Sequence, residues 1–185
     1  MNPDGVKSVA RVPYISEAAA KDVPGLSELY SAITNLRGGV HNLYQALANQ
    51  PPALRAFMGM SRYIRDDSSL DPALRELAIL ATGYALDVPY EKYHHVPAAR
   101  RAGVSEAKLA AFPRWQESRD FSPVERAVLA YADGVARTRS ADDETFRSLE
   151  LYFTEGQIVE LAMTVAWYHF VAAILGPLGI EMEDR

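Results

Sequence analysis

Proline-led helix starts are the feature that most limits what this chain can fold into. Asp71 precedes Pro72, and Ser122 precedes Pro123 with Glu125 three residues after the serine. An Asp or Ser cap followed by proline in the first turn begins a helix, because proline lacks only an N–H that this turn leaves unbonded. Ser-x-x-Glu is also the capping-box spacing. Apolar residues then recur at helical spacing and strand signals are absent. The sequence therefore predicts an all-α bundle with short loops.

The same signals divide the chain into an arm and one domain. Residues 1–25 carry three prolines and are predicted to form an irregular N-terminal arm, which packs on its own body or reaches a neighbouring subunit. Residues 26–185 are predicted to form a single all-helical domain. Pro97 lies inside one expected helix and should kink it or split it just after His95. Residues 66–69 are expected to form a loop, and helices are expected at 26–36, 41–48, 52–64, 72–86, 89–101, 106–112, 123–137, 141–153 and 155–175.

Composition limits the chemistry and the partners. The 185 residues include no cysteine, which excludes disulfides, thiolate metal sites and thiol peroxidase chemistry. A formal net charge of -5 argues against nucleic acid as a partner. The longest apolar stretch, 159–178, is interrupted by Glu160, Thr164 and His169, so we expect no membrane-spanning segment. The N-terminus has no basic-then-apolar signal pattern, and a cytoplasmic protein is the simplest expectation.

Two histidines and two carboxylates fall on consecutive predicted helices. Glu91 lies four residues before His95 and three before His94, so it can neighbour either one. The two histidines diverge by about 100°, and the spacing leaves open which of them faces a pocket. Glu76, on the preceding helix, approaches this face only if the helix register is right. A carboxylate-held histidine is a general acid–base arrangement; a surface or interface ion pair and a buried hydrogen-bond anchor are the alternatives.

Further side chains near this cluster are candidates for binding a substrate. A buried tyrosine hydroxyl needs a partner and can line a polar pocket, although core packing is the alternative for an aromatic at helical spacing. The candidate substrate-binding residues are His94, Tyr90, Arg75 and Tyr84, with Tyr93 and the Trp167-Tyr168-His169 run as secondary candidates.

A metal centre is not expected. Glu91-x-x-His94 matches half of a carboxylate-bridged di-iron site, but such bundles need a second Glu-x-x-His, and this chain has none. The His-Glu-x-x-His spacing of zinc proteases is also absent. We therefore expect a site with no metal and no cofactor.

The central residues resemble the carboxymuconolactone decarboxylase family, which includes the alkylhydroperoxidase D-like proteins. The resembling block runs through 74–80, 90–95 and 98–105, and 122–129 and 167–168 are also similar, so the resemblance covers most of residues 50–180.

The redox branch of this family carries a glutamate twelve residues before a Cys-x-x-Cys-x-x-x-His motif. On this chain Glu76 matches the glutamate and His95 matches the final histidine, while the two cysteine positions fall on Val88 and Glu91. The resemblance implies a retained proton-relay frame from which both thiols are missing.

The resemblance also implies an all-helical fold that assembles as a trimer or hexamer, and chemistry similar to the decarboxylase-like branch, which works without cysteine. The leading hypothesis is a cofactor-free lyase acting on a small organic acid or lactone. His95 is the expected general acid or base, and either Glu91 or Glu76 orients it while the other lines the pocket. His94, Arg75 or a tyrosine stabilises developing charge.

Two alternatives remain open. One is a non-catalytic oligomeric binding or scaffold protein, in which the Glu/His cluster serves packing or a subunit interface. The other is a cofactor-independent isomerase or hydrolase on the same acid–base frame. The sequence does not identify the substrate.

Overall fold

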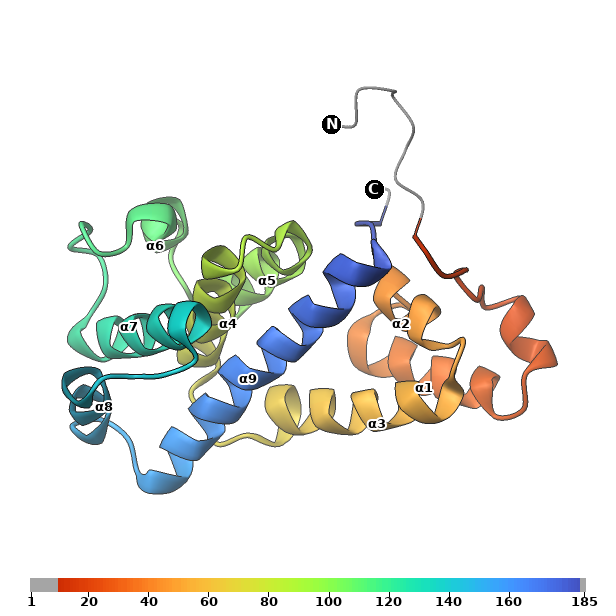
Figure 1. The fold of residues 1–185 in the computed structure, drawn as a ribbon, viewed down its shortest axis with the longest axis horizontal. Coiled ribbons are helices and arrows are strands. Elements are labelled where there is room, and N and C mark those ends of the chain that lie inside the picture. Colours follow the sequence, from red (N-terminus) through yellow and green to blue (C-terminus); the bar gives the residue numbers. More distant parts are fainter. Residues whose placement is uncertain (1–9, 184–185) are drawn as a thin grey trace. The chain divides into compact units, whose positions relative to one another are not determined.

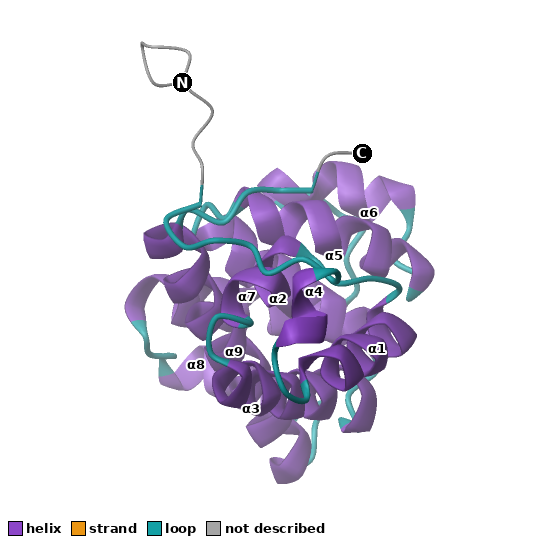
Figure 2. Ribbon diagram, turned by 90° about the vertical axis from the view of Figure 1, so that its right-hand side faces the viewer, coloured by secondary structure: helices purple, strands orange, loops and turns teal. Residues whose placement is uncertain are grey.

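The computed structural model describes residues 10–183, and this range consists of helices joined by loops, without a strand (Figures 1 and 2). The predicted all-α class is confirmed. Residues 1–9 of the predicted arm lie outside the described residues. Contacts along the chain group it into two compact units, Met1–Asp67 with Ile174–Arg185, and Ser68–Ala173.

The first unit opens with a 3-10 turn, Ala19–Asp22, and continues with three α-helices, α1 (Leu26–Arg37), α2 (Asn42–Leu47) and α3 (Pro51–Arg62). Gly38 ends α1 with a φ of 81°, a left-handed conformation that glycine adopts at little cost. The helix predicted to reach residue 64 instead changes into a π-helical turn, Tyr63–Asp67, which takes up half of the predicted 66–69 loop. Arg37 explains this turn, because its guanidinium donates two hydrogen bonds to Asp66, at 2.9 and 3.1 Å.

The described part of the predicted arm packs on its own unit, which is one of the two expected outcomes. The Ile15 N–H donates to the Gln45 carbonyl at 3.1 Å, and the Tyr30 hydroxyl donates to the Ile15 carbonyl at 2.7 Å. Near the other end of the chain, the Glu181 N–H donates to the Tyr14 hydroxyl at 3.1 Å. The division into an arm and a single domain stays a prediction. The grouping of contacts divides the chain after Asp67 instead.

The second unit opens with α4 (Pro72–Ala85) and α5 (Pro89–Arg101), joined by a three-residue connection. Asp71 caps α4 as expected, since its carboxylate accepts from the Ala73 and Leu74 N–H groups at 2.9 and 3.1 Å. Of the two outcomes expected at Pro97, the split is wrong, because α5 continues through this proline; the kink stays a prediction. The last turns of α5 are held by packing, since the neighbouring Ala98 and Ala99 are both buried.

Three α-helices and one 3-10 turn follow before the last helix. Ser105 caps α6 (Glu106–Ala111), the 3-10 turn Phe112–Arg114 comes next, and α7 covers Pro123–Thr138. The helix predicted at 141–153 is shorter, since α8 covers only Asp143–Glu150. The loop between Arg114 and Pro123 is ordered by Arg126, whose guanidinium donates to three loop carbonyls; these belong to Trp115, Gln116 and Ser118.

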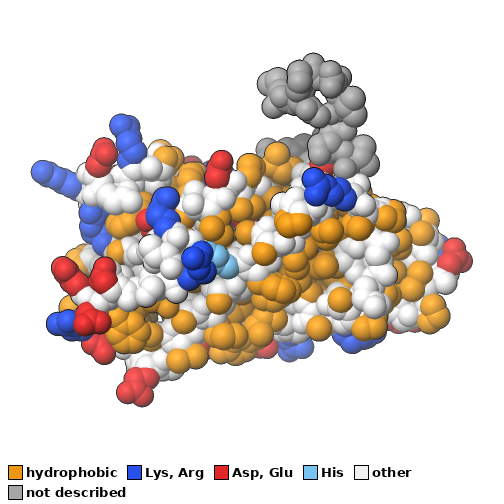
Figure 3. Space-filling view, viewed as in Figure 1, with side chains coloured by type: hydrophobic (Ala, Val, Ile, Leu, Met, Phe, Trp, Pro, Cys, Tyr) orange, Lys and Arg blue, Asp and Glu red, His pale blue; other side chains and the backbone are white. Residues whose placement is uncertain are grey.

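The last helix, α9 (Glu155–Leu178), is long and apolar enough to cross a membrane when judged by length and composition only, contrary to the sequence expectation. The core helix of a soluble protein passes the same test. Ile158, Leu161 and Val165 are indeed buried. Figure 3 shows other hydrophobic side chains on the surface along the diagonal course of α9.

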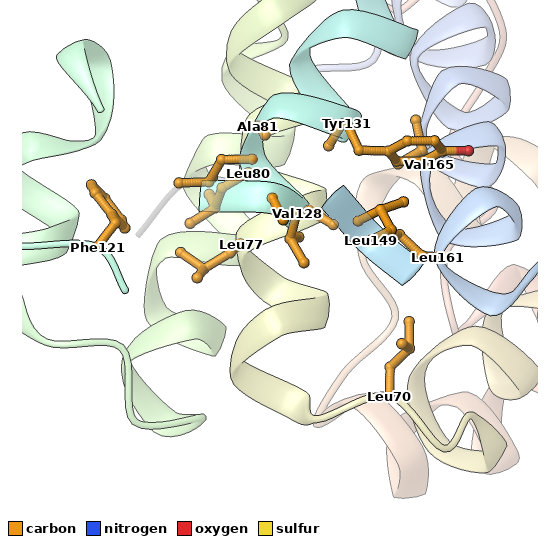
Figure 4. Packing of buried hydrophobic residues seen from close by; sticks show 14 of the residues in the cluster. Leu70, Leu77, Leu80, Ala81, Phe121, Val128, Tyr131, Leu149, Leu161 and Val165 are labelled. Atoms are coloured by element: carbon orange, nitrogen blue, oxygen red, sulfur yellow. The ribbon is translucent and has the colours of Figure 1, made fainter. Parts of the chain in front are cut away.

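The core of the second unit forms where α4, α7, α8 and α9 meet (Figure 4). Leu77 and Leu80 of α4 lie beside Val128 of α7, while Leu149 of α8 lies beside Leu161 of α9. These five side chains are fully buried or nearly so. Burying a side chain of this size is worth roughly 1.5–3 kcal/mol, so this core fixes the position of α4 and thereby of Glu76.

The start of α7 carries a half-buried ion pair that makes stability depend on pH. The Lys108 ammonium lies 2.6 Å from the Glu125 carboxylate, which also accepts from the Ser122 N–H at 2.7 Å. Burial raises the pKa of the Glu125 carboxyl, but the hydrogen bonds from Lys108 and Ser122 outweigh burial and leave this pKa below its ordinary value. Glu125 therefore stabilises the fold above its unfolded-state pKa, and this contribution is lost as the pH falls through the folded-state pKa.

We expect Lys108→Met to lower the free energy of unfolding by about 1 kcal/mol at neutral pH. As the pH falls below about 4.3, the variant should lose less further stability than the wild type, because its Glu125 pKa is closer to the unfolded value. Denaturant unfolding at neutral and acid pH measures both effects. Arg137→Met is the control, because the Arg137 side chain, paired with Asp133, is mostly exposed. An equal loss in both variants would contradict the assignment.

Candidate active site

The structure brings Glu76, Glu91 and His95 together inside the second unit. Glu76 lies in the middle of α4, whereas Glu91 and His95 lie one turn apart on α5. All three are almost fully buried, with exposed fractions of 4%, 3% and 5%. Buried carboxylates are costly unless they are paired, and such clusters are common at functional sites. The sequence left open how α4 and α5 are aligned, and in the structure this alignment places Glu76 beside Glu91 and His95. The catalytic role of the three residues stays a prediction.

The imidazole of His95 stands between the two carboxylates. Its Nδ1 lies 2.7 Å from Glu76 Oε2, the distance of a strong charge-assisted hydrogen bond. Its Nε2 lies 3.4 Å from Glu91 Oε2, a looser approach on the other side of the ring. An Nδ1–H donated to Glu76 fixes the tautomer and leaves Nε2 as the nitrogen that exchanges a proton on the Glu91 side. The arrangement has the geometry of a relay in which one carboxylate orients and the other exchanges protons.

Two opposed carboxylates suit a proton relay better than a metal centre. Each carboxylate approaches a different nitrogen of the same ring, at Nδ1 and at Nε2. A single ion bound by all three residues would need their ligand atoms to converge on one point. The ring of His95 separates the two carboxylate oxygens instead, and the expected absence of a metal stays a prediction.

His95, and not His94, faces the carboxylates. The ring of His94 packs against Tyr90 and Tyr93, with centroids 4.5 and 5.0 Å away. This outcome follows from the turn of about 100° between adjacent helical residues. His95 therefore shares the helix face of Glu91, whereas His94 lies beside Tyr90.

The other candidate binding residues are placed less directly. Tyr84 packs its ring against Phe112, with centroids 5.1 Å apart, and the Lys92 ammonium lies 5.0 Å from the centre of the Tyr84 ring. Tyr84 thus packs against Phe112 and lies close to Lys92. Arg75, one residue before Glu76, is half-buried, and its Nε has no hydrogen-bond partner among the described residues. Substrate binding by these residues stays a prediction.

Tyr168 of α9 contacts the cluster and was only a secondary candidate in the sequence. Its ring is perpendicular to that of His95, with centroids 4.9 Å apart and an interplanar angle of 89°. Tyr168 is also buried, with an exposed fraction of 4%. The ring thus limits how the imidazole can rotate away from the two carboxylates. The neighbouring His169 makes no described contact with His95. Burial, together with the charge of Arg139, lowers the pKa of His169.

Gly83 is a residue of the site that sequence reasoning missed. A Cβ atom at this position of α4 would lie 3.1 Å from the Cβ of Glu91. This distance is tighter than nine in ten contacts of real Cβ atoms, so a glycine here lets α5 approach α4 closely. The available signal was a lone glycine inside a helical pattern, which indicates close packing when it is not a cap.

Comparisons with known proteins match this chain to one family and one fold. Residues 51–134 match the family model for the carboxymuconolactone decarboxylase family. The uncharacterized protein YdfG of Bacillus subtilis (strain 168) is 23% identical over 117 residues, which are 62% of this chain and 79% of that protein.

Solved structures share the fold at low sequence identity. An uncharacterized peroxidase-related protein from Ralstonia eutropha JMP134, described as an alkylhydroperoxidase AhpD core, has a TM-score of 0.81 and 22% identity over 97% of this chain and 95% of its own. The debrominase Bmp8 in complex with 2,3,4-tribromopyrrole has a TM-score of 0.78 and 22% identity over 97% of this chain and 93% of its own.

The matched segment contains all three members of the buried cluster, whereas Tyr168 lies outside it. The chain has no cysteine at any position. The predicted resemblance is therefore confirmed to this extent: residues 51–134 match the carboxymuconolactone decarboxylase family model, and the fold is similar to that of alkylhydroperoxidase AhpD-like structures.

Proposed function

We propose that this chain is a cofactor-free acid–base enzyme acting on a small organic acid or lactone, with decarboxylation as the leading reaction. One observation carries the proposal, namely the buried imidazole of His95 held between two carboxylates at 2.7 and 3.4 Å. Burial removes competing water, which strengthens each electrostatic interaction within the cluster. A general acid or base in such a setting contributes roughly 100- to 10,000-fold to a rate.

The unequal distances divide the roles between the two glutamates. Glu76 makes the shorter contact, so it holds the ring and its tautomer. Glu91 makes the looser contact at Nε2, so it exchanges a proton with His95 and with the substrate. Glu91 is also the residue that stands at a cysteine position of the redox branch, so a carboxylate takes the place of a thiol there. The substitution replaces a redox group with a proton-transfer group.

The chemistry of the leading reaction balances without a cofactor. The bond between the carboxyl carbon and its neighbour breaks, carbon dioxide leaves, and the electron pair stays on the neighbouring carbon. A proton from the Glu91–His95 pair then closes the valence of this carbon. Isomerisation moves a proton between two carbons by the same relay, whereas lactone hydrolysis uses the relay to activate water. These remain the alternative reactions on the same frame.

Similar folds support a small substrate. The debrominase Bmp8, which shares this fold, was solved with 2,3,4-tribromopyrrole, a small ring. The scaffold alternative gives the Glu/His cluster to packing or to a subunit interface. Glu91 and His95 pair within one chain, one turn apart on α5, so their pairing needs no subunit boundary.

A thermal-shift screen of small carboxylic acids and lactones tests the proposal. A compound that binds only the native state at about 100 times its Kd stabilises it by about 2.7 kcal/mol. For a chain of this length, such a gain raises Tm by roughly 5–10 °C. We expect a hit with the wild type that is lost in folded His95→Gln. No shift across the panel, together with a loss of stability or of oligomeric state in His95→Gln, would favour the scaffold.

A further inference from the structure

Arg75 is a half-buried cation without a partner among the described residues. Its Nε is shielded from solvent, and its guanidinium forms no hydrogen bond or ion pair with residues 10–183. Shielded polar groups are bonded in most native structures, so an exception needs a reason. Four other half-buried cations have acceptors: Arg37 in Asp66, Lys92 in Asp87, Lys108 in Glu125, and Arg126 in three loop carbonyls. Arg75 therefore presents an unpaired charge and a fork of N–H donors that no described residue accepts.

Arg75 lies beside Glu76, on the flank of α4 that faces away from the core of the second unit. Adjacent helical residues point about 100° apart, so the residues before and after Glu76 flank it on opposite sides. Leu77 occupies one side and is fully buried in the core (Figure 4). Ile79 and Thr82 follow Arg75 along the other side at helical spacing, and both are fully buried. Solvent therefore reaches this flank at Arg75, where the two terminal guanidinium nitrogens are not shielded.

The cluster next to Arg75 is acidic and repels an anionic substrate. Glu76 and Glu91 are both buried against one imidazole. A third negative charge close to two carboxylates is costly, so an organic acid that approaches as an anion needs a cation beside the cluster. Lys92 follows Glu91 in the chain, but its ammonium is engaged by the Asp87 carboxylate at 3.0 Å. Arg75 precedes Glu76 and has no such partner among the described residues, so it is the cation that an anionic substrate can use.

We infer that Arg75 binds a carboxylate of the substrate and thereby selects an anionic acid over an uncharged compound of the same shape. The inference rests on the proposed acid–base function of the cluster and adds the residue that decides the charge of the substrate. A guanidinium matches the two oxygens of a carboxylate with two parallel N–H donors, which fixes orientation as well as charge. The carboxylate that Arg75 holds serves for binding only, and the bond that reacts lies next to Glu91 and His95.

Thermal stability separates this binding role from a structural one. An unpaired, half-buried guanidinium costs free energy in the folded protein. Arg75→Met keeps the aliphatic stem and removes the charge, so its Tm should equal or exceed that of the wild type. Arg126→Met is the matched comparison, since Arg126 is also half-buried but donates to three loop carbonyls; its Tm should fall by roughly 3–10 °C. An equal fall in Arg75→Met would show that Arg75 holds the fold together and would overturn the inference.

Binding of matched acids and amides to the full chain tests the selection of charge. The probes are benzoate with benzamide, 2-furoate with 2-furamide, and crotonate with crotonamide, and calorimetric titration near pH 7 at constant ionic strength gives each Kd. We expect the wild type to bind at least one acid roughly tenfold or more tightly than its amide. Arg75→Met should weaken binding of this acid by about 10- to 150-fold and leave the amide unchanged. Arg114→Met, which removes an exposed arginine, should change neither Kd.

The outcomes distinguish the role of Arg75 from the proposed function. Acids and amides that bind the wild type equally well, or a preference for the acid that survives in Arg75→Met, would overturn the role of Arg75 and leave the acid–base function of the cluster standing. A preference lost equally in Arg114→Met would assign it to the net charge of the protein and would also overturn the inference. If no acid and no amide binds, the proposed function fails for this class of compound, and the role of Arg75 fails with it.

Discussion

Glu91→Gln is expected to lower kcat/KM by about 100- to 10,000-fold while the protein stays folded. The amide keeps the size of the side chain but cannot carry the proton that the Glu91 carboxylate exchanges with His95 Nε2 across 3.4 Å. The rate is measured on the first compound found to bind the native protein. If the loss falls on kcat and not on KM, the carboxylate acts in the transition state.

Glu150→Gln is the matched control for this change. Glu150 is an exposed glutamate in the last turn of α8, in the same unit as the site. It should leave kcat/KM unchanged within a factor of about two, since exposed substitutions away from a site have small effects. Activity of Glu91→Gln equal to that of the wild type would exclude Glu91 as the proton-exchanging group.

Gly83→Val is expected to lower the free energy of unfolding by about 1–3 kcal/mol and to reduce activity as well. A Cβ at this position already comes within 3.1 Å of the Glu91 Cβ, and the two further methyl groups of valine must push α5 away from α4. Because Glu76 lies on α4 and His95 on α5, this movement also lengthens the 2.7 Å contact between them. Denaturant unfolding and kcat/KM measure the two effects.

Gly134→Val separates close packing from helix propensity. Gly134 lies within α7, and a Cβ there would meet nothing within 4 Å. Valine is a slightly better helix former than glycine, so this variant should be neutral or slightly more stable. Equal destabilisation by both substitutions would show that the approach of α4 and α5 at Gly83 does not matter.

Much of the fold was predictable because helix starts are local. The Asp71 cap and the capping box of Ser122 with Glu125 are each recognisable from a few neighbouring residues, and both are present in the structure. The errors lie where tertiary contacts override local rules. Packing of Ala98 and Ala99 carries α5 through Pro97, and the Arg37–Asp66 ion pair shapes a π-helical turn out of residues that read as a helix end and a loop.

The candidate site was predictable only in part, for the same reason. The four-residue spacing of Glu91 and His95 guarantees a shared helix face, so this pair followed from sequence alone. The approach of Glu76 depends on how α4 and α5 are aligned, which Gly83 and the core set through long-range packing. Tyr168 comes from α9, far along the chain, and no local pattern ties it to His95.

The most direct test of the proposed proton relay is the uptake of solvent deuterium by the product. The first compound that the wild type converts is incubated with enzyme in D₂O, and the product is analysed by mass spectrometry and NMR. A relay that protonates carbon through Glu91 and His95 predicts one deuterium on the reacting carbon, formed at a rate that falls with Glu91→Gln. Conversion with no deuterium on carbon, or at the same rate in that variant, would contradict the proposed carbon-protonating relay.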